Sequence, residues 1–290
     1  MSDLSVSILG LGAMGARMAV RFLDAGHPVT VYNRTAERAL PLQKMGARVE
    51  QTPREAAAAS GVVLAMVRDD EASRDLWSGP DGALFGLKER AVAVECSTLT
   101  PGRVREWAER VRAMGARPVE APVVGTRPQA EAGALGILVG ADEADVPRVQ
   151  PVFDVIGGAV FPVGSPGDAA VLKLAVNALF AVQVAAVAEG LAFARRSGLD
   201  PERVAEVLGA LPVTSRAAKG AMGAMLAGQF APLFPIDLVQ KDLRYAADTA
   251  ASVGADVPLA QATGDVFGRA SGAGFGGLNI TGVARLYECR

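Results

Sequence analysis

Residues 5–26, SVSILGLGAMGARMAVRFLDAG, decide the fold of this 290-residue chain. The run SVSIL (5–9) is short and apolar, as expected of a strand buried on both faces, and a helical stretch follows it. Between the two, Gly10, Gly12 and Gly15 form G-x-G-x-x-G, a turn at which a helix start can hold a diphosphate. The stretch therefore predicts a dinucleotide site. The residues expected to form it here are Gly10, Gly12, Ala13, Met14 and Gly15.

The end of the next predicted strand, VTVY (29–32), indicates which dinucleotide is bound. Sites for NAD carry Asp or Glu about 20 residues beyond the glycines, where the carboxylate binds the ribose 2′-hydroxyl. This chain has Asn33, Arg34 and Thr35 instead, so no carboxylate repels a 2′-phosphate and Arg34 can pair with one. We expect NADP(H), with these three residues at its 2′-phosphate. Arg34 as a solvated turn residue and Thr35 as a helix cap are alternative roles that do not exclude this one.

Strands and helices continue to alternate up to Gly164, which predicts an α/β fold with a doubly wound, Rossmann-type sheet. The predicted strands are 47–50, 62–67, 91–95, two runs within 116–141 joined by a Gly/Pro-rich connection, and 159–164; the predicted helices are 35–46, 52–61, 69–77, 102–115 and 142–156. Ligands bind at the carboxyl ends of the strands. The loop residues expected to line the cofactor cleft there are Met66, Val67, Ser97 and Thr98. Thr98 is also expected to start the next helix, and Cys96 to be a packing residue.

Beyond Gly164 only helices are predicted, so we expect two domains, 1–164 for the dinucleotide and 165–290 for substrate and dimerisation. The predicted helices are 167–197, 200–210, roughly 214–227, 235–253 and 257–270. The glycine-rich segment 271–282 is expected to be either a lid over a cleft or a mobile connection to a last short helix.

The helix predicted for residues 167–197 is long enough to span a membrane. Isolated polar residues, among them Lys173 and Asn177, would be expensive in hydrocarbon, so a buried central helix of a soluble protein is favoured. Lys173 and Asn177 are four residues apart and share one face. A buried ammonium is costly unless it is paired or reaches an open cleft, which makes Lys173 a candidate functional residue. The alternative is that its charge snorkels to the surface.

Composition limits the function further. The formal net charge is −2, from 29 basic and 31 acidic residues, which gives no basic footprint for nucleic acid or an anionic membrane. The first residues lack the features of a signal peptide, so a cytoplasmic location is expected. Two cysteines, Cys96 and Cys289, indicate neither a disulfide framework nor a metal site. Because His27 is the single histidine, acid–base chemistry is expected to use Lys, Tyr or a carboxylate.

The order of these pieces resembles the β-hydroxyacid dehydrogenase family, the 3-hydroxyisobutyrate dehydrogenase-like enzymes, over nearly the whole chain. GLGAMGARMA is similar to the family's cofactor-binding start and ECSTLTP to its D-x-S-T-x-x-P loop. EAPVVGTRPQAEAGAL is similar to D-A-P-V-S-G-G followed by G-A-x-x-G-T-L, GSPGDAAVLKLAVN to the lysine signature G-x-G-x-x-x-K-x-x-x-N, and VQKDLRYA to the K-D-L motif. Five such motifs in one order are a specific resemblance.

The resemblance implies a Rossmann domain and a helical domain of the 6-phosphogluconate dehydrogenase type, joined by a long helix that helps form a homodimer or homotetramer. It makes Lys173 the catalytic general acid and base, and places Thr98 and Lys241 against the nicotinamide end of an NADP(H) cofactor. The residues it assigns to the substrate are Ser97, Val124, Gly125, Thr126 and Asn177.

The chain departs from the family pattern in the substrate loop. Val124 and Thr126 replace the serine and the second glycine of S-G-G, the motif glycine after Gly167 is missing, and Asn279 stands where many relatives have Asp. Because the serine holds a substrate carboxylate in relatives, a weaker preference for carboxylates is expected here. The backbone N–H of Gly125 and the side chain of Arg127 are the remaining candidates to hold one.

The resulting hypothesis is hydride transfer between NADP(H) and a small 3-hydroxy acid or its semialdehyde or keto partner. An imine reductase is one alternative, although such enzymes typically have Asp or Tyr where Lys173 stands. A non-catalytic NADP-binding module is the other, and the joint presence of Lys173, Asn177 and Lys241 argues against it.

Overall fold

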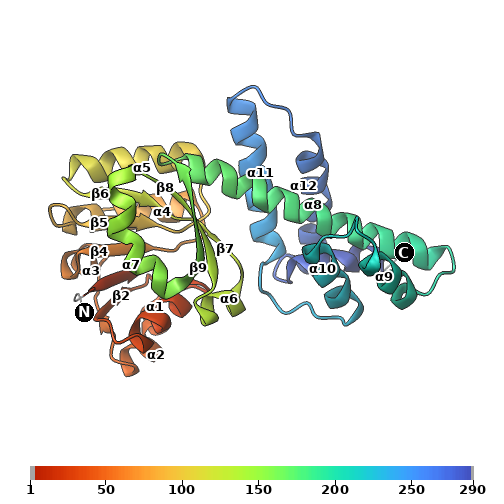
Figure 1. Ribbon diagram of the computed structural model, residues 1–290, viewed down its shortest axis with the longest axis horizontal. Helices are drawn as coiled ribbons and strands as arrows, with labels where there is room; N and C mark the ends of the chain where they lie inside the picture. The colour runs from red at the N-terminus through yellow and green to blue at the C-terminus, as the bar shows by residue number, and fades with distance from the viewer. Residues whose placement is uncertain (1–3, 289–290) are drawn as a thin grey trace. The chain divides into compact units, whose positions relative to one another are not determined.

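The computed structural model describes residues 4–288, so the prediction about Cys289 falls outside the described residues. The chain divides into two compact units, the first ending at Lys173 and the second beginning at Leu174. Both are seen in Figure 1, and each is described separately below. The predicted domain boundary at residue 164 coincides with the end of the last strand, whereas the two units divide later, inside a long helix.

In residues 4–173, a nine-stranded sheet forms the centre of the first unit, in the order β3-β2-β1-β4-β5-β6-β8-β7, with β9 also paired to β8. The strands are β1 (Val6–Leu9), β2 (Val29–Tyr32), β3 (Arg48–Val49), β4 (Val62–Ala65), β5 (Val92–Glu95), β6 (Arg117–Glu120), β7 (Val123–Val124), β8 (Leu135–Ala141) and β9 (Gly157–Gly164). Pairing is parallel from β3 to β6, and β8 runs antiparallel to β6 and β7. The strand order reverses between β1 and β4, the place where such sheets bind ligands.

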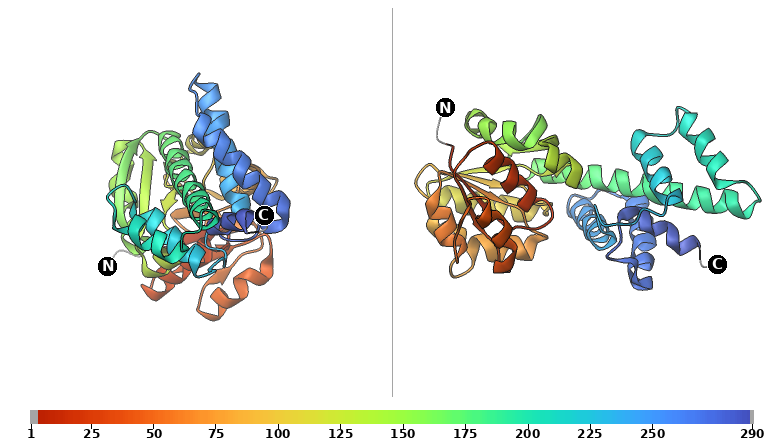
Figure 2. Two further views of the ribbon diagram at one scale, coloured as in Figure 1. Left: turned by 90° about the vertical axis from the view of Figure 1, so that its right-hand side faces the viewer. Right: turned by 90° about the horizontal axis from the view of Figure 1, so that it is seen from below.

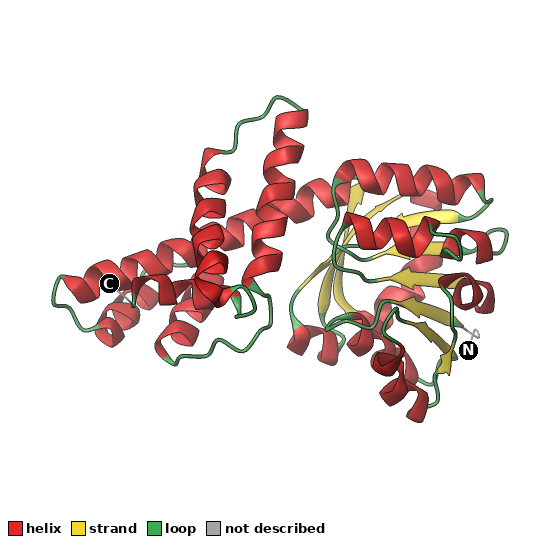
Figure 3. Ribbon diagram, turned by 180° about the vertical axis from the view of Figure 1, so that it is seen from behind, coloured by secondary structure: helices red, strands yellow, loops and turns green. Residues whose placement is uncertain are grey.

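Helices cover both faces of this sheet, as Figure 3 shows. They are α1 (Gly15–Asp24), α2 (Leu40–Lys44), α3 (Pro53–Ala59), α4 (Asp70–Ser78), α5 (Pro101–Ala113), α6 (Arg127–Ala132) and α7 (Val146–Ile156). Successive side chains of a strand point to opposite faces of the sheet. Ile8 packs in the cluster with α1 and α7, and Leu9 packs in the cluster with α3, α4 and α5. The Rossmann-type α/β prediction is confirmed.

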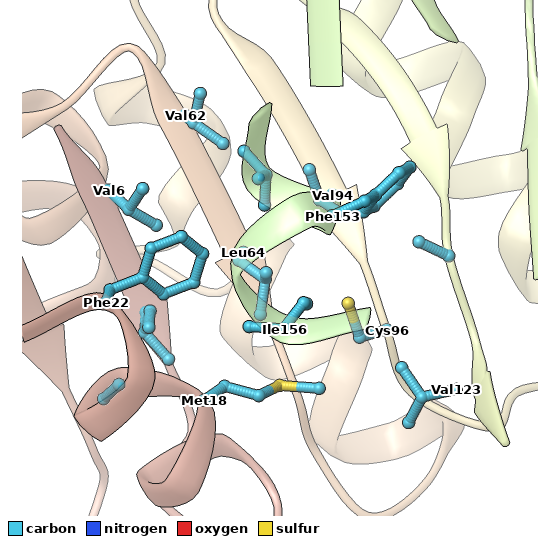
Figure 4. Packing of buried hydrophobic residues seen from close by; sticks show 14 of the residues in the cluster. Val6, Met18, Phe22, Val62, Leu64, Val94, Cys96, Val123, Phe153 and Ile156 are labelled. Carbon is cyan, nitrogen blue, oxygen red and sulfur yellow. The ribbon is translucent and has the colours of Figure 1, made fainter. Parts of the chain in front are cut away.

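The core on the α1 and α7 side is built from fully buried side chains (Figure 4). Phe22 and Met18 of α1 lie against the strand residues Ile8 and Leu64, and Phe153 packs from α7. Burying one such side chain contributes about 1.5–3 kcal/mol, so this face stabilises the sheet strongly. Cys96 is part of the same cluster, and burial raises the pKa of its thiol well above the usual range. It is a packing residue, as expected.

Within residues 174–288, the second unit is built from helices joined by turns, with one isolated β-bridge and no strand, which confirms the predicted all-α part. Its helices are α8 (Asp168–Arg196), whose first turns lie in the first unit, α9 (Pro201–Ala210), α10 (Arg216–Leu226), α11 (Ile236–Ser252) and α12 (Pro258–Ala270). Both views in Figure 2 draw α8 as one unbroken helix. Small residues such as Ala181, Ala185 and Ala188 on its buried face belong to the core of this unit and allow close packing.

The expected burial of the long helix holds on one face only. The most apolar 18-residue window of α8 has a mean hydropathy of 2.0, within the range of a membrane span, and is 39% buried. On the other face Leu179 and Phe193 are 62% and 75% exposed, and Ala186 between them is exposed as well. The polarity of Lys173 and Asn177 correctly identified the buried face, but the sequence did not reveal that apolar residues on the opposite face are exposed.

Several predicted boundaries are wrong for local reasons. The helix predicted at 35–46 is split into a 3₁₀ turn, Ala36–Ala39, and the short α2, because Pro41 lacks an N–H and starts a new helix. The strand predicted at 62–67 ends at Ala65, and the helix predicted from 142 begins at Val146 after a 3₁₀ turn. The Gly/Pro-rich connection within 116–141 contains β7 and α6, which were not foreseen.

The helix after β5 is capped by Thr100, not by Thr98 as expected. Thr100 Oγ1 accepts the backbone N–H of Arg103 at 3.2 Å, and Pro101 follows as the first helical residue. The Thr100 hydroxyl also donates to Asp70 Oδ2 at 2.6 Å, which joins the starts of α4 and α5. Thr98 is thereby left two residues upstream, in the loop at the end of β5.

The glycine-rich segment 271–282 is folded against the start of α11. It contains a π-helical turn, Ser271–Phe275, and begins a 3₁₀ helix, Ile280–Tyr287. Asn279 is 8% exposed, and its Oδ1 accepts the backbone N–H of Phe234 at 3.0 Å. The Leu278 carbonyl accepts the N–H of Ile236 at 2.9 Å. These bonds argue against the alternative of a mobile connection, and the alternative of a lid stays a hypothesis.

Candidate active site

The glycine turn after β1 has the geometry of a nucleotide-binding loop. Gly10 has φ +96°, in the region that favours glycine, and a Cβ there would overlap the carbonyl of Met66. A Cβ on Gly15 would overlap the carbonyl of Gly10, so the absence of a side chain lets α1 pack close to the strand. A Cβ on Gly12, in contrast, would meet nothing within 4 Å. The fold does not require glycine at position 12, whereas a ligand approaching the backbone would, and this fits a bound dinucleotide.

Asn33 ties the glycine turn to the end of β2. Its Oδ1 accepts the backbone N–H of Leu11 at 2.8 Å, and its Nδ2 donates to the Thr35 carbonyl at 2.8 Å. The side chain therefore fixes two loops that meet at the carboxyl ends of β1 and β2. Asn33 has this structural role whatever it contributes to cofactor binding.

Arg34 and Thr35 are exposed at the same edge of the sheet. Burial raises the pKa of the neighbouring Tyr32 hydroxyl, and the nearby positive charge of Arg34 lowers it. Thr35 occupies the cap position of the 3₁₀ turn, but its side chain makes no capping hydrogen bond. The alternative role of Thr35 as a capping side chain is therefore wrong, whereas the exposed guanidinium of Arg34 stays a predicted phosphate contact.

The loops after β4 and β5 are held together by Ser97. Its Oγ accepts the backbone N–H of Val67 at 2.8 Å, and its own N–H donates to Glu95 Oε1 at 3.1 Å. Met66 and Val67 are half-buried beside the glycine turn, since both lie where a Cβ on Gly10 would reach. Thr98 follows, half-buried. Four predicted cofactor or substrate residues thus lie in two adjoining loops.

Glu95 organises this edge and was not among the predicted site residues. It is fully buried, and its Oε2 accepts from Trp77 Nε1 at 2.8 Å and from the Ser73 hydroxyl at 3.0 Å. Burial raises the pKa of the Glu95 carboxyl, and hydrogen bonds from Ser97, Trp77 and Ser73 oppose that rise. The sequence feature that could have identified Glu95 was its place at the start of the E-C-S-T motif, directly before Cys96.

The expected substrate loop comprises β7, which is last in the strand order, and α6, which is joined to α1 by the ion pair of Glu131 with Arg17 Nε at 2.6 Å. Val124 pairs with Gly136 of β8 and is half-buried. Gly125 has φ +130°, and Thr126 donates from both N–H and Oγ1 to Gln129 Oε1, at 2.9 and 3.0 Å. Thr126 therefore caps α6. Arg127 Nε is buried without a hydrogen-bond partner among the described residues.

Lys173 and Asn177 lie one turn apart on α8, and each is 8% exposed. The side-chain amide of Asn177 donates to Asp242 Oδ2 at 2.6 Å, which joins α8 to α11 (Figure 1). Asp242 Oδ1 lies 3.0 Å from Lys241 Nζ, and that ammonium is 4.9 Å from the ring centre of Tyr245. The structure thus links two predicted site residues, Asn177 and Lys241, through a carboxylate.

Asp242 is a second candidate site residue that the sequence prediction missed, because it contacts both Asn177 and Lys241. It is 3% exposed, so a carboxylate here requires the amide and ammonium partners that it has. The signal was present in the K-D-L motif, in which only the lysine was assigned a role. No local sequence pattern distinguishes a buried aspartate from a solvated one on a helix.

Two family models cover almost the whole chain. Residues 5–164 match the NAD binding domain of 6-phosphogluconate dehydrogenase, and residues 167–287 match the model described as NAD-binding of NADP-dependent 3-hydroxyisobutyrate dehydrogenase. The chain is 32% identical to glyoxylate/succinic semialdehyde reductase 2 of Arabidopsis thaliana, over 98% of this chain and 79% of that protein. It is 33% identical to the cytokine-like nuclear factor N-PAC of Gallus gallus, where 99% of this chain spans only 52% of the relative.

Solved structures agree in fold. The 3-hydroxyisobutyrate dehydrogenase of Mycobacterium tuberculosis, solved with L-serine, superposes with a TM-score of 0.90 at 27% identity, over 98% of each chain. Psf3, solved with NADP⁺ and 2-OPP, gives 0.89 at 26% identity, over 97% of this chain and 99% of that one. An imine reductase from Pseudomonas sp. gives a lower score, 0.65 at 25% identity, over 98% and 99%.

Proposed function

The chain belongs to the β-hydroxyacid dehydrogenase family, and on that premise we propose that it transfers hydride between NADP(H) and a small 3-hydroxy acid or its semialdehyde or keto partner. The membership makes it an NAD(P)-dependent oxidoreductase of the 3-hydroxyisobutyrate dehydrogenase and semialdehyde reductase type. The observation that carries the finer proposal is the pair of buried polar residues on α8, Lys173 and Asn177.

Lys173 is the proposed general acid and base. As a carbonyl is reduced, negative charge develops on its oxygen, and a positioned ammonium both stabilises that charge and donates a proton. In the oxidative direction the same amine accepts the proton of the hydroxyl. An apolar helix favours this role because an ammonium interacts more strongly with a developing charge where water is scarce.

Asn177 is the proposed partner of Lys173 in binding the substrate. Since its amide group is already bonded to Asp242, the orientation of the side chain is fixed before the substrate arrives. The amide group held in this way would orient a hydroxyl or carbonyl group of the substrate. Such preorganisation lowers the entropy cost of reaching a reactive geometry.

The cofactor proposed for the dinucleotide site is NADP(H), with NADPH preferred over NADH. The nicotinamide, when bound, supplies or accepts the hydride. Gly12 leaves room for the diphosphate, the start of α1 offers N–H groups, and Arg34 offers a guanidinium for a 2′-phosphate. Lys241 and Thr98 are proposed to contact the nicotinamide end, and Met66 and Val67 to line the cleft beside it.

The presence of Val124 supports the proposal that binding of the substrate depends less on a carboxylate than it does in typical relatives. It offers no hydroxyl donor, and Thr126 uses its hydroxyl to cap α6. The remaining donors of this loop are the Gly125 N–H and the Arg127 guanidinium. Equal or better turnover of glyoxylate or a short semialdehyde acid than of matched neutral aldehydes would contradict this part of the proposal.

Two other functions remain to be compared by experiment. An imine reductase is the second candidate enzyme, but the imine reductase from Pseudomonas sp. superposes less closely than the hydroxyacid dehydrogenase does. A non-catalytic NADP-binding module is suggested by the likeness to a protein named as a nuclear factor. Burial of an ammonium and an amide one turn apart favours a hydroxyacid dehydrogenase over both, since neither alternative needs that pair.

A second copy of the chain is the proposed cover for the exposed apolar face of α8. Leu179, Ala186 and Phe193 recur every seven residues along one stripe, the spacing with which helices of two chains pack. A homodimer or homotetramer would bury this stripe. The proposal includes no nucleic-acid or membrane partner, and it places the protein in the cytoplasm.

The deciding experiment follows oxidation of NADPH and of NADH against matched small aldehydes, ketones, semialdehyde acids and cyclic imines. Turnover of a carbonyl compound with NADPH is the expected result. Turnover confined to imines would favour the imine reductase, and tight NADPH binding without any turnover would favour the binding module.

A further inference from the structure

Glu120, the last residue of β6, reaches the start of α8. The residue is 1% exposed, and its Oε2 accepts the backbone N–H of Gly167 at 2.7 Å. Gly167 directly precedes the first residue of α8, Asp168. A carboxylate from the dinucleotide-binding sheet thus holds the start of the helix that carries Lys173.

Two glycines make room for this contact. Gly140 of β8 is the register partner of Glu120, and a Cβ on Gly140 would lie 2.5 Å from Glu120 Oε2 and 2.8 Å from the Ser165 carbonyl oxygen. Gly167 has φ +103°, and a Cβ there would lie 2.8 Å from Arg105 Nε. A side chain at position 140 would displace the Glu120 carboxylate or the turn before α8, and a side chain at position 167 would be strained by the positive φ. Both glycines therefore suit the contact between β6 and the start of α8.

The surroundings of Glu120 shift the pKa of its carboxyl group in both directions. Burial, the largest influence, raises its pKa to about 7, while the backbone N–H groups of Gly167, Ala170 and Ala169 lower it. The charge of Asp168 on α8 raises it further, and Arg105 on α5 pairs with Asp168 at 4.0 Å. Glu95 is the register neighbour on β5. The helix start, whose N–H groups carry partial positive charge, is the main partner that offsets the cost of burial.

We propose that Glu120 is a positioning residue, which fixes the first turn of α8 to the sheet and thereby sets the position of Lys173. Lys173 follows Gly167 by six residues, which is about 9 Å or less than two turns of helix. Within so short a helical segment, a shift of the first turn moves the lysine with it. The proposal rests on the proposed role of Lys173 in catalysis.

The test compares Glu120→Ala and Glu120→Gln with the wild type. Gln keeps an acceptor oxygen for the Gly167 N–H, whereas Ala removes it. Glu109→Gln is the matched control, because Glu109 is exposed on α5 and its change alters the charge equally. Three readouts are needed: amide hydrogen exchange of residues 167–171, kcat with a carbonyl substrate, and the Kd for NADPH.

For Glu120→Ala we expect about tenfold faster exchange confined to residues 167–171, as for a lost helix cap, and a kcat about tenfold lower. The Kd for NADPH should stay within about twofold, and Glu120→Gln should restore most of both losses. Unchanged exchange at the first turn, or faster exchange throughout the chain with weaker NADPH binding, would overturn the proposal.

Lys173→Ala separates this proposal from the proposed function. If that variant keeps wild-type turnover, the assigned role of Lys173 is wrong, and the kcat of Glu120→Ala no longer reports on it. The exchange rates of residues 167–171 would still decide whether Glu120 holds the first turn. If Lys173→Ala is inactive while Glu120→Ala keeps full kcat, the positioning role alone is overturned.

Discussion

The side-chain amide of Asn177 on α8 donates to Asp242 Oδ2 on α11 at 2.6 Å, and both residues are buried. The same carboxylate lies 3.0 Å from Lys241 Nζ. One aspartate therefore orients the proposed substrate-binding amide and the lysine proposed to contact the cofactor. Its own charge is compensated by the partners that it positions.

Replacing Asp242 with Asn should reduce kcat/KM for the carbonyl substrate by about 10- to 100-fold, since a buried charged hydrogen bond is worth roughly 1.5–3 kcal/mol. The variant also leaves Lys241 without its carboxylate partner. Steady-state kinetics at saturating NADPH measure the loss. Asp248→Asn on α11 is a control on the same helix, and an equal loss in both variants would contradict a specific role for Asp242.

Arg34→Ala should raise the KM for NADPH by about tenfold or more, because a charge-assisted contact to the 2′-phosphate is lost. The KM for NADH should change little, since NADH has no 2′-phosphate. The ratio of kcat/KM for the two cofactors measures the effect, with Arg38→Ala in the following 3₁₀ turn as the control. An equal fall in kcat/KM with NADPH and with NADH would show that Arg34 does not select NADPH.

Alanine at Gly10 should lower the stability of the protein, whereas alanine at Gly12 should weaken NADPH binding. Gly10→Ala forces a side chain against the Met66 carbonyl at φ +96°, so a loss of stability of at least about 1 kcal/mol is expected. Gly12→Ala meets open space in the protein, so its Tm should be unchanged while NADPH binding weakens. Thermal unfolding and NADPH titration measure the two effects. Full NADPH affinity in a stable Gly12→Ala would contradict the assigned diphosphate approach.

Glu120 should make the free energy of unfolding depend on pH. Its folded pKa of about 7 lies above the usual value of 4.5, so the folded protein keeps a proton that the unfolded chain releases. The stability contribution is therefore full below about pH 4.5 and is lost as pH rises through 7, by up to about 3 kcal/mol. Urea unfolding from pH 5 to 8 should show this fall in the wild type and a flatter profile in Glu120→Gln. Parallel profiles for the two proteins would refute the assignment.

The sequence was sufficient for the fold where patterns are local. The glycines at 10, 12 and 15 lie between a strand and a helix, and the Thr52 and Glu55 capping box lies at the start of α3, where a helix was predicted. Local patterns did not fix every helix boundary. The break at Pro41 and the cap at Thr100 each depend on one or two residues, and the sequence around them is compatible with more than one helix start.

The site was predictable only in part. The polar pair on α8 could be found because an ammonium and an amide are conspicuous in an apolar helix. Asp242, Glu95 and Glu120 could not be found this way, because charged residues on a helix or at a strand end are usually solvated. Their burial is created by partners far along the chain, such as Asn177 for Asp242 and Gly167 for Glu120.

The most direct test of the account is the turnover of Lys173→Ala with NADPH and the best carbonyl substrate from the panel. We predict a kcat lower by about 10²–10⁴-fold, the usual contribution of a positioned general acid, with the Kd for NADPH unchanged. A Lys173→Ala variant that keeps wild-type kcat and binds NADPH normally would contradict the proposed mechanism.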